Sequence, residues 1–467
     1  MTARPLTRLP VPPGPAGVMA VLPALRAALL GSGAAVAPVP LPGAGVSAVY
    51  ADRVVAALRP DDGSAPLERP EVALVCATSG STGSPRGVML SELAVLSAVD
   101  ALHDRVGGAG RWVVAMPLHH VGGLMVLARS VVSGVQPVAD PSVGGASAFD
   151  PATFVETTAR ARALSDADGA PLYVSLVPTQ LARLTAWPGG LDTLAQYDAV
   201  LSGAAATPGG LLASLRDGGV QVLASYGMSE TCGGCVYDGA PLAGVVVQVV
   251  DGDGAVVGQL PASAAAAGAP VAGEASTSGL AGSGRVHVGG RTLFTGYRLE
   301  PALTAAALAG GLLVTGDVGE IGPDGRLHVL GRVDDIVQVG GTSVALGAVA
   351  EAVRAVPGVA AAEVVAVADP EWGSAVHAVV VLAGASAESS SAGPSPAPAA
   401  PASAELAASV RELVGTRLGR AARPRSVVAV DVLPLLPSGK ADRDALRALV
   451  AGTRTIPTER DGAALER

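Results

Sequence analysis

The sequence predicts an α/β protein with a large N-terminal α/β domain, a small β-rich subdomain within it, and a small α+β C-terminal domain. The chain has 467 residues, more than one hydrophobic core usually holds, so at least two domains are expected. Short apolar runs alternate with helical patterns over the first half of the chain, which is typical of a largely parallel sheet covered by helices. From Val245 the pattern changes to short strands separated by glycine-rich turns, which indicates the β-rich subdomain.

The first predicted unit is a strand, a polar loop and a helix. A short apolar strand pattern covers residues 71–77, a loop rich in Ser, Thr and Gly continues to Gly87, and a helical pattern runs from about Ser91 to Arg105. The same strand pattern recurs four times further along, at Trp112–Met116, Leu172–Val177, Ala199–Leu201 and Val222–Ala224.

Domain boundaries follow from changes in composition. We expect an N-terminal domain over residues 1–330 and a C-terminal domain over residues 336–452, joined by residues 331–335. Residues 385–404 are almost wholly Ala, Ser, Pro and Glu, too poor in large apolar groups to offset chain entropy, so they are predicted to be a disordered insertion. Residues 453–467 are predicted to form a loose tail.

The charge and hydropathy of the chain exclude several classes of protein. Forty acidic and 31 basic side chains give a net charge of -9, which opposes binding of nucleic acid. Mean hydropathy is +0.46, but no apolar run reaches the roughly 18 residues of a membrane span. Val18–Leu30 resembles the apolar part of a signal peptide, but it contains a proline and Arg26. The sequence therefore predicts a soluble cytoplasmic protein.

Cysteine usage agrees with a reducing compartment. The three cysteines, Cys76, Cys232 and Cys235, are too few for a secreted disulfide framework. The Cys232 and Cys235 pair has the spacing of a redox motif or of half a zinc site. A redox pair needs a helix N-terminus and zinc needs further ligands nearby, and neither pattern is present, so incidental small residues are favoured.

The loop Thr78–Gly87 has the composition of a polyphosphate cradle. Its glycines let the backbone approach a phosphate, its hydroxyls donate hydrogen bonds, and Arg86 adds positive charge. We place it between a strand and a helix, whose N-terminus also attracts anions. It lacks the Lys-Ser/Thr pair of ordinary nucleoside triphosphatases. A flexible polar connection is the alternative reading.

Lys440 is the single lysine of a chain that otherwise uses arginine. Lysine offers a compact charge on a thin stem that can reach between two oxygens of a reacting centre, which arginine cannot do as readily. The turn Leu436-Pro437-Ser438-Gly439 presents it. Survival of one lysine on a solvated loop is the alternative reading.

Five motifs in order resemble those of the adenylate-forming superfamily, which contains acyl-CoA synthetases, peptide-synthetase adenylation domains and firefly luciferase. The resemblance covers roughly residues 70 to 450. The motifs are the hydroxyl-rich loop, Tyr226-Gly227-Met228-Ser229-Glu230, Thr315-Gly316-Asp317, Gly331-Arg332-Val333-Asp334-Asp335, and Pro437-Ser438-Gly439-Lys440.

The resemblance implies an ATP site, and ATP, Mg2+ and CoA as cofactor and co-substrates. It implies that the loop closes over the phosphates, that Tyr226 stacks on adenine beside the Ser202–Ala205 segment, and that Glu230 holds magnesium. The implied ATP-binding residues are Thr78, Ser79, Gly80, Ser81, Thr82, Gly83, Arg86, Ser202, Gly203, Ala204, Tyr226, Gly227, Ser229, Asp317 and Arg332, the last two as ribose contacts. Arg86 and Ser229 stand where a lysine and a threonine are usual.

Catalysis and domain motion are also implied by the resemblance. Lys440 would bridge the substrate carboxylate and the α-phosphate, and Glu230 and His120 complete the implied catalytic set. Asp334 matches the hinge about which a mobile C-terminal domain rotates between adenylation and thiol attack. Thr342–Ala345 follows the hinge glycines where many relatives carry more polar residues, which leaves the thiol site less defined than the nucleotide site.

Two further segments, Met116–Leu124 and Leu176–Arg183, resemble those of o-succinylbenzoate-CoA ligases of menaquinone biosynthesis. The high Ala, Gly and Arg usage is of the actinobacterial type. The implied reaction adenylates o-succinylbenzoate and transfers the acyl group to CoA, releasing AMP and pyrophosphate. Adenylation of another aryl or small carboxylic acid, with CoA or a carrier protein as acceptor, is the alternative, and a non-catalytic nucleotide-binding protein is a second one.

A substrate with two carboxylates needs one fixed while the other reacts, and arginine is the natural clamp. We nominate Arg183 as this clamp, with His120, Thr179 and Gly227 as further substrate-binding residues; an exposed helix charge at Arg183 and a core histidine at His120 are the alternatives. The Gly122 and Gly123 pair is expected to leave space for an aromatic ring. The sequence leaves the oligomeric state open, a homodimer included.

Lys440→Ala is expected to abolish formation of the acyl-adenylate more severely than its conversion to the thioester. The ammonium group stabilises charge that develops in the first half-reaction only. Pyrophosphate release measures the first half-reaction, and thioester formation from a synthetic acyl-adenylate and CoA measures the second. Equal loss in both assays would refute this division of labour.

Overall fold

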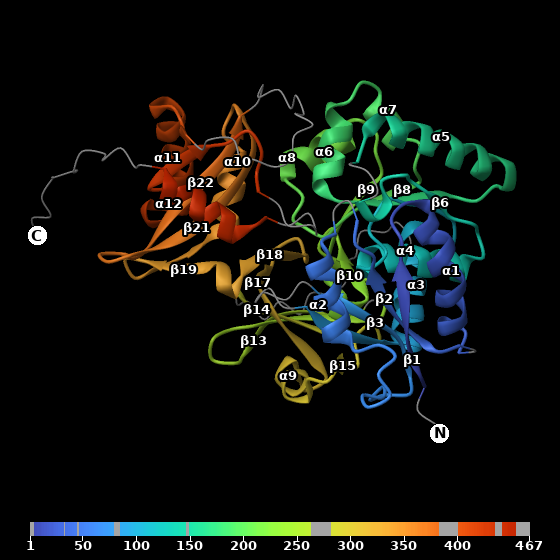
Figure 1. Ribbon diagram of the computed structural model, residues 1–467. Coiled ribbons are helices and arrows are strands. Elements are labelled where there is room, and N and C mark those ends of the chain that lie inside the picture. Colours follow the sequence, from blue (N-terminus) through green and yellow to red (C-terminus); the bar gives the residue numbers. More distant parts are fainter. Residues whose placement is uncertain are drawn as a thin grey trace, which may run out of the picture. The chain divides into compact units, whose positions relative to one another are not determined.

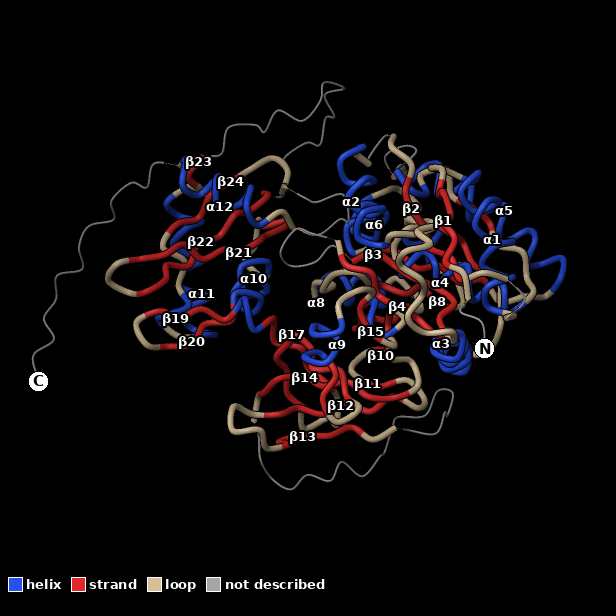
Figure 2. The backbone as a smooth tube through the Cα atoms, turned by 60° about the horizontal axis from the view of Figure 1, so that its bottom comes forward, coloured by secondary structure: helices blue, strands red, loops and turns tan. Residues whose placement is uncertain are grey.

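Three β-sheets build the chain as far as Val329, and a fourth builds the part that begins at Leu330 (Figures 1 and 2). The computed structural model describes residues 4–31, 33–43, 46–78, 85–145, 149–262, 282–382, 400–434 and 441–453. The two parts are compact units with their own cores. This architecture confirms the predicted fold class.

The central sheet has seven strands in the order β11-β10-β9-β8-β7-β5-β6. Strands β6, β5, β7, β8 and β9 run parallel, as predicted, and β10 and β11 add an antiparallel edge. The strands are β5 (Arg111–Val114), β6 (Val138–Ala139), β7 (Leu172–Leu176), β8 (Ala199–Ser202), β9 (Val222–Met228), β10 (Gly233–Tyr237) and β11 (Ala240–Pro241).

Helices cover both faces of the central sheet because its side chains alternate between two cores. Trp112 and Val114 of β5 belong to the core that contains α3 (Glu92–Val106) and α4 (Val121–Ser133). Val113 belongs to the opposite core, with α5 (Pro151–Asp168), α6 (Pro178–Ala186), α7 (Gly190–Leu194) and α8 (Gly209–Asp217). Each fully buried large apolar side chain contributes about 1.5–3 kcal/mol.

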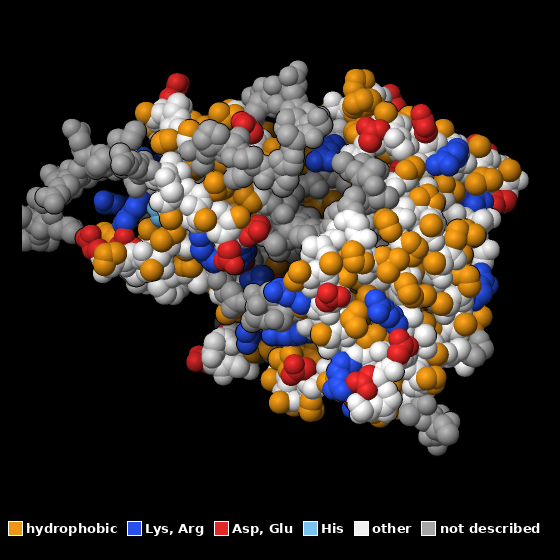
Figure 3. Space-filling model, in the orientation of Figure 1, with side chains coloured by type: hydrophobic (Ala, Val, Ile, Leu, Met, Phe, Trp, Pro, Cys, Tyr) orange, Lys and Arg blue, Asp and Glu red, His pale blue; other side chains and the backbone are white. Residues whose placement is uncertain are grey.

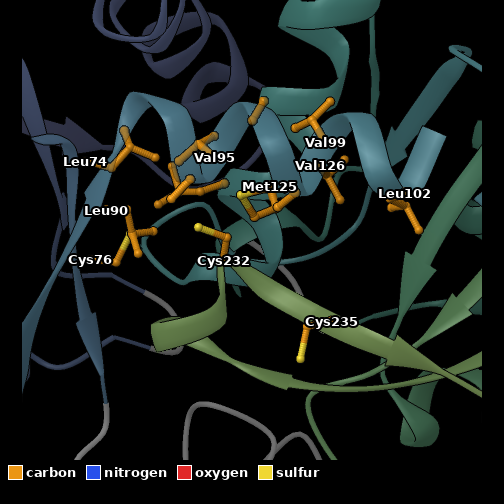
Figure 4. Packing of buried hydrophobic residues seen from close by; sticks show 14 of the residues in the cluster. Leu74, Cys76, Leu90, Val95, Val99, Leu102, Met125, Val126, Cys232 and Cys235 are labelled. Carbon is orange, nitrogen blue, oxygen red and sulfur yellow. The ribbon is translucent and has the colours of Figure 1, made fainter. Parts of the chain in front are cut away.

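A second sheet, β1-β2-β3-β4-β15, packs on the other side of α3. Figure 4 shows Leu74 and Leu90 of this sheet beside Val95 of α3, with Met125 of α4 in the same cluster. Its elements are β1 (Leu6–Val11), α1 (Pro15–Leu29), β2 (Ala35–Pro40), α2 (Ala48–Leu58), β3 (Val72–Thr78), β4 (Arg86–Ser91) and β15 (Gly296–Tyr297).

Strand β4 corrects the predicted position of the hydroxyl-rich loop. The loop was expected between a strand and a helix, but it joins β3 to β4, which pair antiparallel from Thr78 and Arg86 onward. Val88, Met89 and Leu90 form an apolar run that is buried as a strand, and α3 begins only after Ser91, whose hydroxyl caps Ala94 N–H. The loop is therefore not followed by a helix N-terminus.

The third sheet is the predicted β-rich subdomain. It runs antiparallel in the order β13-β12-β14-β17-β16, with β18 paired to β17. Alternate residues of β12 are buried, which is the pattern of a sheet with one covered face. The elements are β12 (Val245–Val250), β13 (Val256–Leu260), β14 (Gly284–Gly290), α9 (Pro301–Ala307), β16 (Leu308–Ala309), β17 (Leu312–Ile321) and β18 (Leu327–Arg332).

The C-terminal unit has the predicted α+β composition. Its sheet, β20-β19-β22-β24-β23 with β21 paired to β22, carries α10 and α11 on one core and α12 on another. The elements are β19 (Ile336–Val339), β20 (Thr342–Ala345), α10 (Leu346–Arg354), β21 (Val359–Asp369), β22 (Gly373–Leu382), β23 (Ala400–Pro401), α11 (Ala404–Leu418), β24 (Ser426–Ala429) and α12 (Arg443–Gly452).

The predicted disordered insertion, residues 385–404, lies outside the described residues as far as residue 399. Its last residues are ordered. Ala400 and Pro401 form β23 against β24, and the Ser403 hydroxyl caps α11. A paired edge strand and a helix cap supply the hydrogen bonds that the composition alone does not suggest. The predicted tail lies outside the described residues from residue 454 onward.

The three cysteines are buried free thiols. Burial raises the pKa of Cys76 and of Cys235 to about 12, and raises that of Cys232 as well. Figure 4 shows them within the apolar cluster. Protonated thiols in apolar surroundings are inert, which favours the incidental reading of the Cys232 and Cys235 pair.

The visible surface carries basic and acidic side chains that are interspersed rather than gathered by sign (Figure 3). Among the described residues, no helix combines the length and the apolar character needed to cross a bilayer.

Arg298, which follows β15, anchors the second sheet. It is buried, and it donates hydrogen bonds to the carbonyls of Leu58 at 2.5 Å and Ala65 at 2.6 Å and to a Glu68 carboxylate oxygen at 2.6 Å. The Leu299 N–H donates to the other Glu68 oxygen at 2.6 Å. The segment around Glu68, 230 residues earlier in the sequence, is thereby fixed to the residues that follow β15.

Arg298→Ala should lower the free energy of unfolding by about 3–5 kcal/mol, because it leaves buried carbonyls and Glu68 without their donor. Urea unfolding followed by circular dichroism measures this loss. Arg162→Ala, which removes an exposed ion pair with Asp166, is the matched control and should cost less than about 1 kcal/mol. Equal losses in the two variants would contradict the anchoring role.

Candidate active site

The carboxyl ends of four parallel strands place ten of the predicted site residues along one edge of the central sheet. In parallel sheets these ends share an edge, and ligands bind there. The residues follow β5 (His120), β7 (Thr179, Arg183), β8 (Ser202, Gly203, Ala204), and lie at or after the end of β9 (Tyr226, Gly227, Ser229, Glu230).

The segment after β8 forms a small, tightly held surface. Ser202 Oγ shares a hydrogen bond of 2.6 Å with Thr207 Oγ1, and its carbonyl accepts one of 2.9 Å from Ser225 Oγ. A Cβ at Gly203 would lie 2.7 Å from Ser225 Oγ, so glycine is required there. Ala204 is exposed and has φ of 67°, a left-handed conformation that a side chain larger than a methyl group would strain further. The segment therefore presents backbone and small side chains.

Tyr226 connects the central sheet to the third sheet. Its hydroxyl donates a hydrogen bond of 2.7 Å to Asp317 Oδ2 on β17. Burial, and after it the negative charge of Asp317, raise the pKa of Tyr226, so the hydroxyl stays protonated. Asp317 is buried, and its backbone N–H donates to Thr315 Oγ1 at 3.1 Å. The aromatic ring and the carboxylate are thus held side by side.

Gly227 lies where β9 and β10 approach closely. A Cβ on Gly227 would lie 2.0 Å from the carbonyl oxygen of Gly233, so no other residue fits. The register of this strand pair shifts between Gly234 and Val236, and after β9 the chain turns into the short helix η2 (Ser229–Thr231). The close approach of β9 and β10 thus lies directly before Ser229 and Glu230.

Glu230 is held by two groups from the segment around β15. Tyr297 donates a hydrogen bond of 2.8 Å to Glu230 Oε1, and the Phe294 N–H donates one of 2.8 Å to the Glu230 carbonyl. Burial and then the Glu230 charge raise the pKa of Tyr297, whereas the positive charge of Arg86 opposes that rise. Arg86 at the start of β4 therefore belongs to the same electrostatic neighbourhood.

Tyr297 and Thr207 were missed by sequence reasoning, and neither belongs to one of the five motifs. Thr315 was noted only as the first residue of the Thr315-Gly316-Asp317 motif, without a role of its own. Tyr297 reaches Glu230 only because β15 pairs with β4, and residues 67 apart in the chain then meet. The Gly-Tyr pair ahead of a proline-initiated helix was the available signal, and it indicates a turn rather than a function.

Histidines 119 and 120 precede α4 with their ring centroids 4.2 Å apart. His119 is buried, and its ring also meets the edge of Tyr50 at 6.4 Å. Burial, and then the neighbouring His120, hold the pKa of His119 well below its usual value, so the ring is neutral. His120 is partly buried at the N-terminus of α4.

The expected space beside Gly122 and Gly123 is filled by the protein itself, so that expectation was wrong. A Cβ on Gly122 would lie 2.6 Å from the Met116 methyl group, and a Cβ on Gly123 would lie 2.3 Å from the Pro117 carbonyl oxygen. Both glycines allow the Met116 and Pro117 segment to pack against α4. They do not outline a cavity for a ring.

Thr179 and Arg183 lie on the exposed side of α6. The Arg183 guanidinium donates one long hydrogen bond of 3.4 Å to the Phe149 carbonyl. Among the described residues it forms no hydrogen bond or ion pair with another predicted site residue. The structure therefore brings Tyr226 to Asp317, and Glu230 and Arg86 to Tyr297, but it does not bring Arg183 into contact with any of them.

The remaining predicted residues belong to other segments of the chain. Ser79, Gly80, Ser81, Thr82, Gly83 and Lys440 lie outside the described residues, whereas Thr78 ends β3 opposite Arg86. Arg332 is exposed at the end of β18, and Asp334 follows in the short helix η3 (Val333–Asp335).

Comparison with known families matches most of the chain. The description "AMP-binding enzyme" applies to residues 33–298, and "AMP-binding enzyme C-terminal domain" to residues 348–440. The chain belongs to the AMP-binding enzyme family. A probable 2-succinylbenzoate–CoA ligase of Mycobacterium tuberculosis is 34% identical over 95% of this AMP-binding enzyme and 98% of its own length. A feruloyl-CoA synthase of Amycolatopsis is 30% identical over 80% of the chain and 69% of its own length.

Solved structures have the same fold. The amide bond synthetase McbA of Marinactinospora thermotolerans is 25% identical, with a TM-score of 0.71 over 96% of this chain and 90% of that one. The o-succinylbenzoate CoA synthetase of Bacillus subtilis, in complex with its acyl-adenylate intermediate, is 23% identical, with a TM-score of 0.70 over 96% and 89%.

The oxygen donors of this AMP-binding enzyme fit magnesium. Glu230 offers a carboxylate, and Ser229 and Thr78 offer hydroxyls. Across the described ranges no cluster of three or more His, Cys, Asp or Glu could hold a metal by itself. Magnesium commonly binds through one or two carboxylates together with water and substrate phosphates, so a single glutamate can serve it.

Stability should fall with acid partly through His119. Its pKa in the folded chain lies well below that of the unfolded chain, about 6.5. Below that pH the unfolded state takes up a proton that the folded state excludes, so the contribution is complete above about pH 6.5 and is lost as the pH falls, by up to about 1.4 kcal/mol per pH unit. We expect His119→Gln to flatten this slope in urea unfolding between pH 7 and 5.

The buried His103 and His377 and the partly buried His287 also have lowered pKa values, so some slope should remain in His119→Gln. An unchanged slope in His119→Gln would refute the burial of a neutral ring.

Proposed function

We propose that this protein is an ATP-dependent acid–thiol ligase that adenylates o-succinylbenzoate and transfers the acyl group to CoA, with release of AMP and pyrophosphate. The observation that carries the proposal is the 34% identity to a probable 2-succinylbenzoate–CoA ligase along 95% of the chain. A match over both domains supports the complete two-step reaction. The product would serve menaquinone biosynthesis.

In the first half-reaction a substrate carboxylate oxygen attacks the α-phosphorus of ATP, and pyrophosphate leaves. Adenine would lie along Ser202–Ala205 against Tyr226, with the ribose at Asp317 and Arg332; the 2.7 Å bond from Tyr226 to Asp317 supports a shared nucleoside site. Glu230 and Ser229 would hold magnesium, which neutralises phosphate charge. Thr78–Gly83 and Arg86 would bind the phosphates, and Lys440 would stabilise the charge that develops on the attacked phosphate.

In the second half-reaction the CoA sulfur attacks the acyl carbon and AMP leaves. We propose that residues 331–335 form a hinge, with Asp334 as pivot, between domains at 1–330 and 336–452. The change of compact unit between Val329 and Leu330 supports a boundary at this place. Separate use of the C-terminal domain in the two steps would expose the thioester site only after pyrophosphate has left.

The acyl pocket is assigned to His120, Thr179, Arg183 and Gly227. The exposed guanidinium of Arg183, with one long bond to a carbonyl, supports its availability to a second carboxylate. His120 and Gly227 lie at the same edge of the central sheet, after β5 and near the end of β9, with β7 and β8 between them. ATP and CoA are intracellular co-substrates, so we place the reaction in the cytoplasm.

Adenylation of another aryl acid is the second candidate. The relationship to a feruloyl-CoA synthase, 30% identical over 80% of the chain, favours it specifically. Pyrophosphate release across a panel of aryl, dicarboxylic and fatty acids distinguishes the two. If benzoates or fatty acids are used faster than o-succinylbenzoate, the narrow assignment falls while the ligase class stands. Thioester formation on a carrier protein, and not on free CoA, would identify the carrier protein as the thiol acceptor.

Arg183→Met is expected to raise KM for o-succinylbenzoate about tenfold to a hundredfold, since charge-assisted hydrogen bonds contribute about 1.5–3 kcal/mol. KM for ATP and turnover of benzoate should not change, because neither presents a second carboxylate. Steady-state pyrophosphate release gives these constants. The control is Arg216→Met, which removes a comparably exposed arginine of α8 that pairs with Asp238. An unaltered KM for o-succinylbenzoate in Arg183→Met would exclude the clamp.

A further inference from the structure

The Tyr297 hydroxyl joins two sheets at Glu230, the carboxylate that is proposed to hold magnesium. Its hydroxyl lies 2.8 Å from Glu230 Oε1, although Tyr297 belongs to β15 of the second sheet and Glu230 follows β9 of the central sheet. Tyr297 belongs to none of the five motifs that carry the proposed function. In the described part of the chain, Glu230 Oε2 accepts no hydrogen bond, so the two carboxylate oxygens are in different environments.

The Tyr297 side chain starts from a fixed backbone. Its N–H donates a hydrogen bond of 2.8 Å to Thr304 Oγ1, and the next residue, Arg298, is anchored in the buried network described above. Gly296 has φ of 146°, and a Cβ there would lie 2.7 Å from the Thr304 methyl group, so β15 and α9 are packed closely. The Phe294 ring lies against the Tyr297 ring at 4.9 Å and 68°. The hydroxyl therefore has little freedom.

The Glu230 backbone is fixed from the same side. Its carbonyl accepts the Phe294 N–H at 2.8 Å, and the neighbouring Thr231 hydroxyl bonds to the Gly233 carbonyl at 2.7 Å. A glutamate side chain on a fixed backbone still has three rotatable bonds. A hydrogen bond to one carboxylate oxygen removes most of that freedom before any ligand arrives, which is how second partners orient metal-binding carboxylates.

The register of β15 places Tyr297 beside the strand that starts at Arg86. Tyr297 is opposite Val88, and the Arg298 N–H donates a hydrogen bond of 2.8 Å to the Gly87 carbonyl. One short segment thus contacts both the strand that follows the proposed phosphate loop and the glutamate of the proposed metal site. The distance between strand β4 and Glu230 therefore depends on Tyr297 and Arg298.

We propose that Tyr297 is a positioning residue that holds Glu230 through Oε1, so that Oε2 is the oxygen offered to magnesium on the ATP phosphates. The inference rests on the proposed role of Glu230. It assigns Tyr297 no contact with ATP and no part in bond making. Its effect should therefore appear in metal affinity more than in the turnover of the metal-saturated enzyme.

Tyr297→Phe tests the proposal because it keeps the ring and removes only the hydroxyl. In the full-length protein with a non-hydrolysable ATP analogue, Mn2+ binding is measured by electron paramagnetic resonance from the free-ion signal. We expect the Kd for Mn2+ to rise about tenfold, as for other residues that orient metal ligands, with unchanged affinity for the analogue in EDTA. The Mg2+ concentration for half-maximal pyrophosphate release should rise by the same factor, with kcat at saturating Mg2+ close to normal.

Tyr173→Phe is the matched control. Its hydroxyl also bonds across the fold, to the carbonyls of Val106 and Gly108 at 3.2 Å each, but at the amino end of β7, the edge of the central sheet opposite to the one at which Glu230 follows β9. It should lower the urea midpoint without changing the Kd for Mn2+. Thr304→Val leaves the Tyr297 hydroxyl in place but loosens its backbone, and should raise the Kd about twofold to threefold, between the wild type and Tyr297→Phe. An unchanged Kd in Tyr297→Phe would overturn the proposal.

Glu230→Gln separates failure of this inference from failure of the proposed function. If Glu230→Gln binds Mn2+ as the wild type does, the metal role of Glu230 is wrong, and the positioning role falls with it. If Glu230→Gln loses affinity, Tyr297→Phe should add nothing further in the double variant, because both act through one carboxylate. Losses that multiply in the double variant would leave Glu230 as the metal ligand and reject Tyr297 as its positioning residue.

Discussion

The pair of hydrogen bonds at the end of β9 is the constraint on which the N-terminal unit depends. Tyr226 donates to Asp317 of the third sheet, and Glu230 accepts from Tyr297 of the second sheet. All three sheets of this unit are thus joined within five residues of the sequence. Such bonds are costly to leave unmade in a low-dielectric interior. The groups proposed to bind nucleotide and metal are therefore also the groups that fix how the sheets meet.

Much of the fold was predictable because buried strands and helices leave recognisable apolar patterns in the sequence. Val113 and Val174 face one core while Trp112 and Tyr173 face the other, so β5 and β7 appear as continuous apolar runs between helical patterns. Strand β4 was missed because its apolar run Val88–Leu90 leads directly into the cap of α3. A short apolar run beside a helix start cannot be distinguished from the helix by periodicity.

The site residues likewise fall into two groups, those placed by strand topology and those placed by long-range contacts. Residues after the strands of a parallel sheet share an edge by topology alone, so Ser202, Tyr226 and Glu230 could be grouped from the sequence. Tyr297 could not, because its contact depends on the pairing of β15 with β4. The space beside Gly122 could not be assigned either, since a glycine does not reveal whether a ligand or, as here, Met116 fills it.

The C-terminal unit limits where a hinge could act. Asp335 is buried and receives both guanidinium nitrogens of Arg443, one at 2.6 Å, which fixes the end of the connecting segment to α12. The Asp442 N–H donates to the Pro434 carbonyl at 3.0 Å, so the described residues on either side of residues 435–440 are held together. If Asp334 is the pivot, as proposed, rotation about it would therefore leave Asp335, α12 and Pro434 together as one body, and backbone freedom before Asp335 would determine how that body turns.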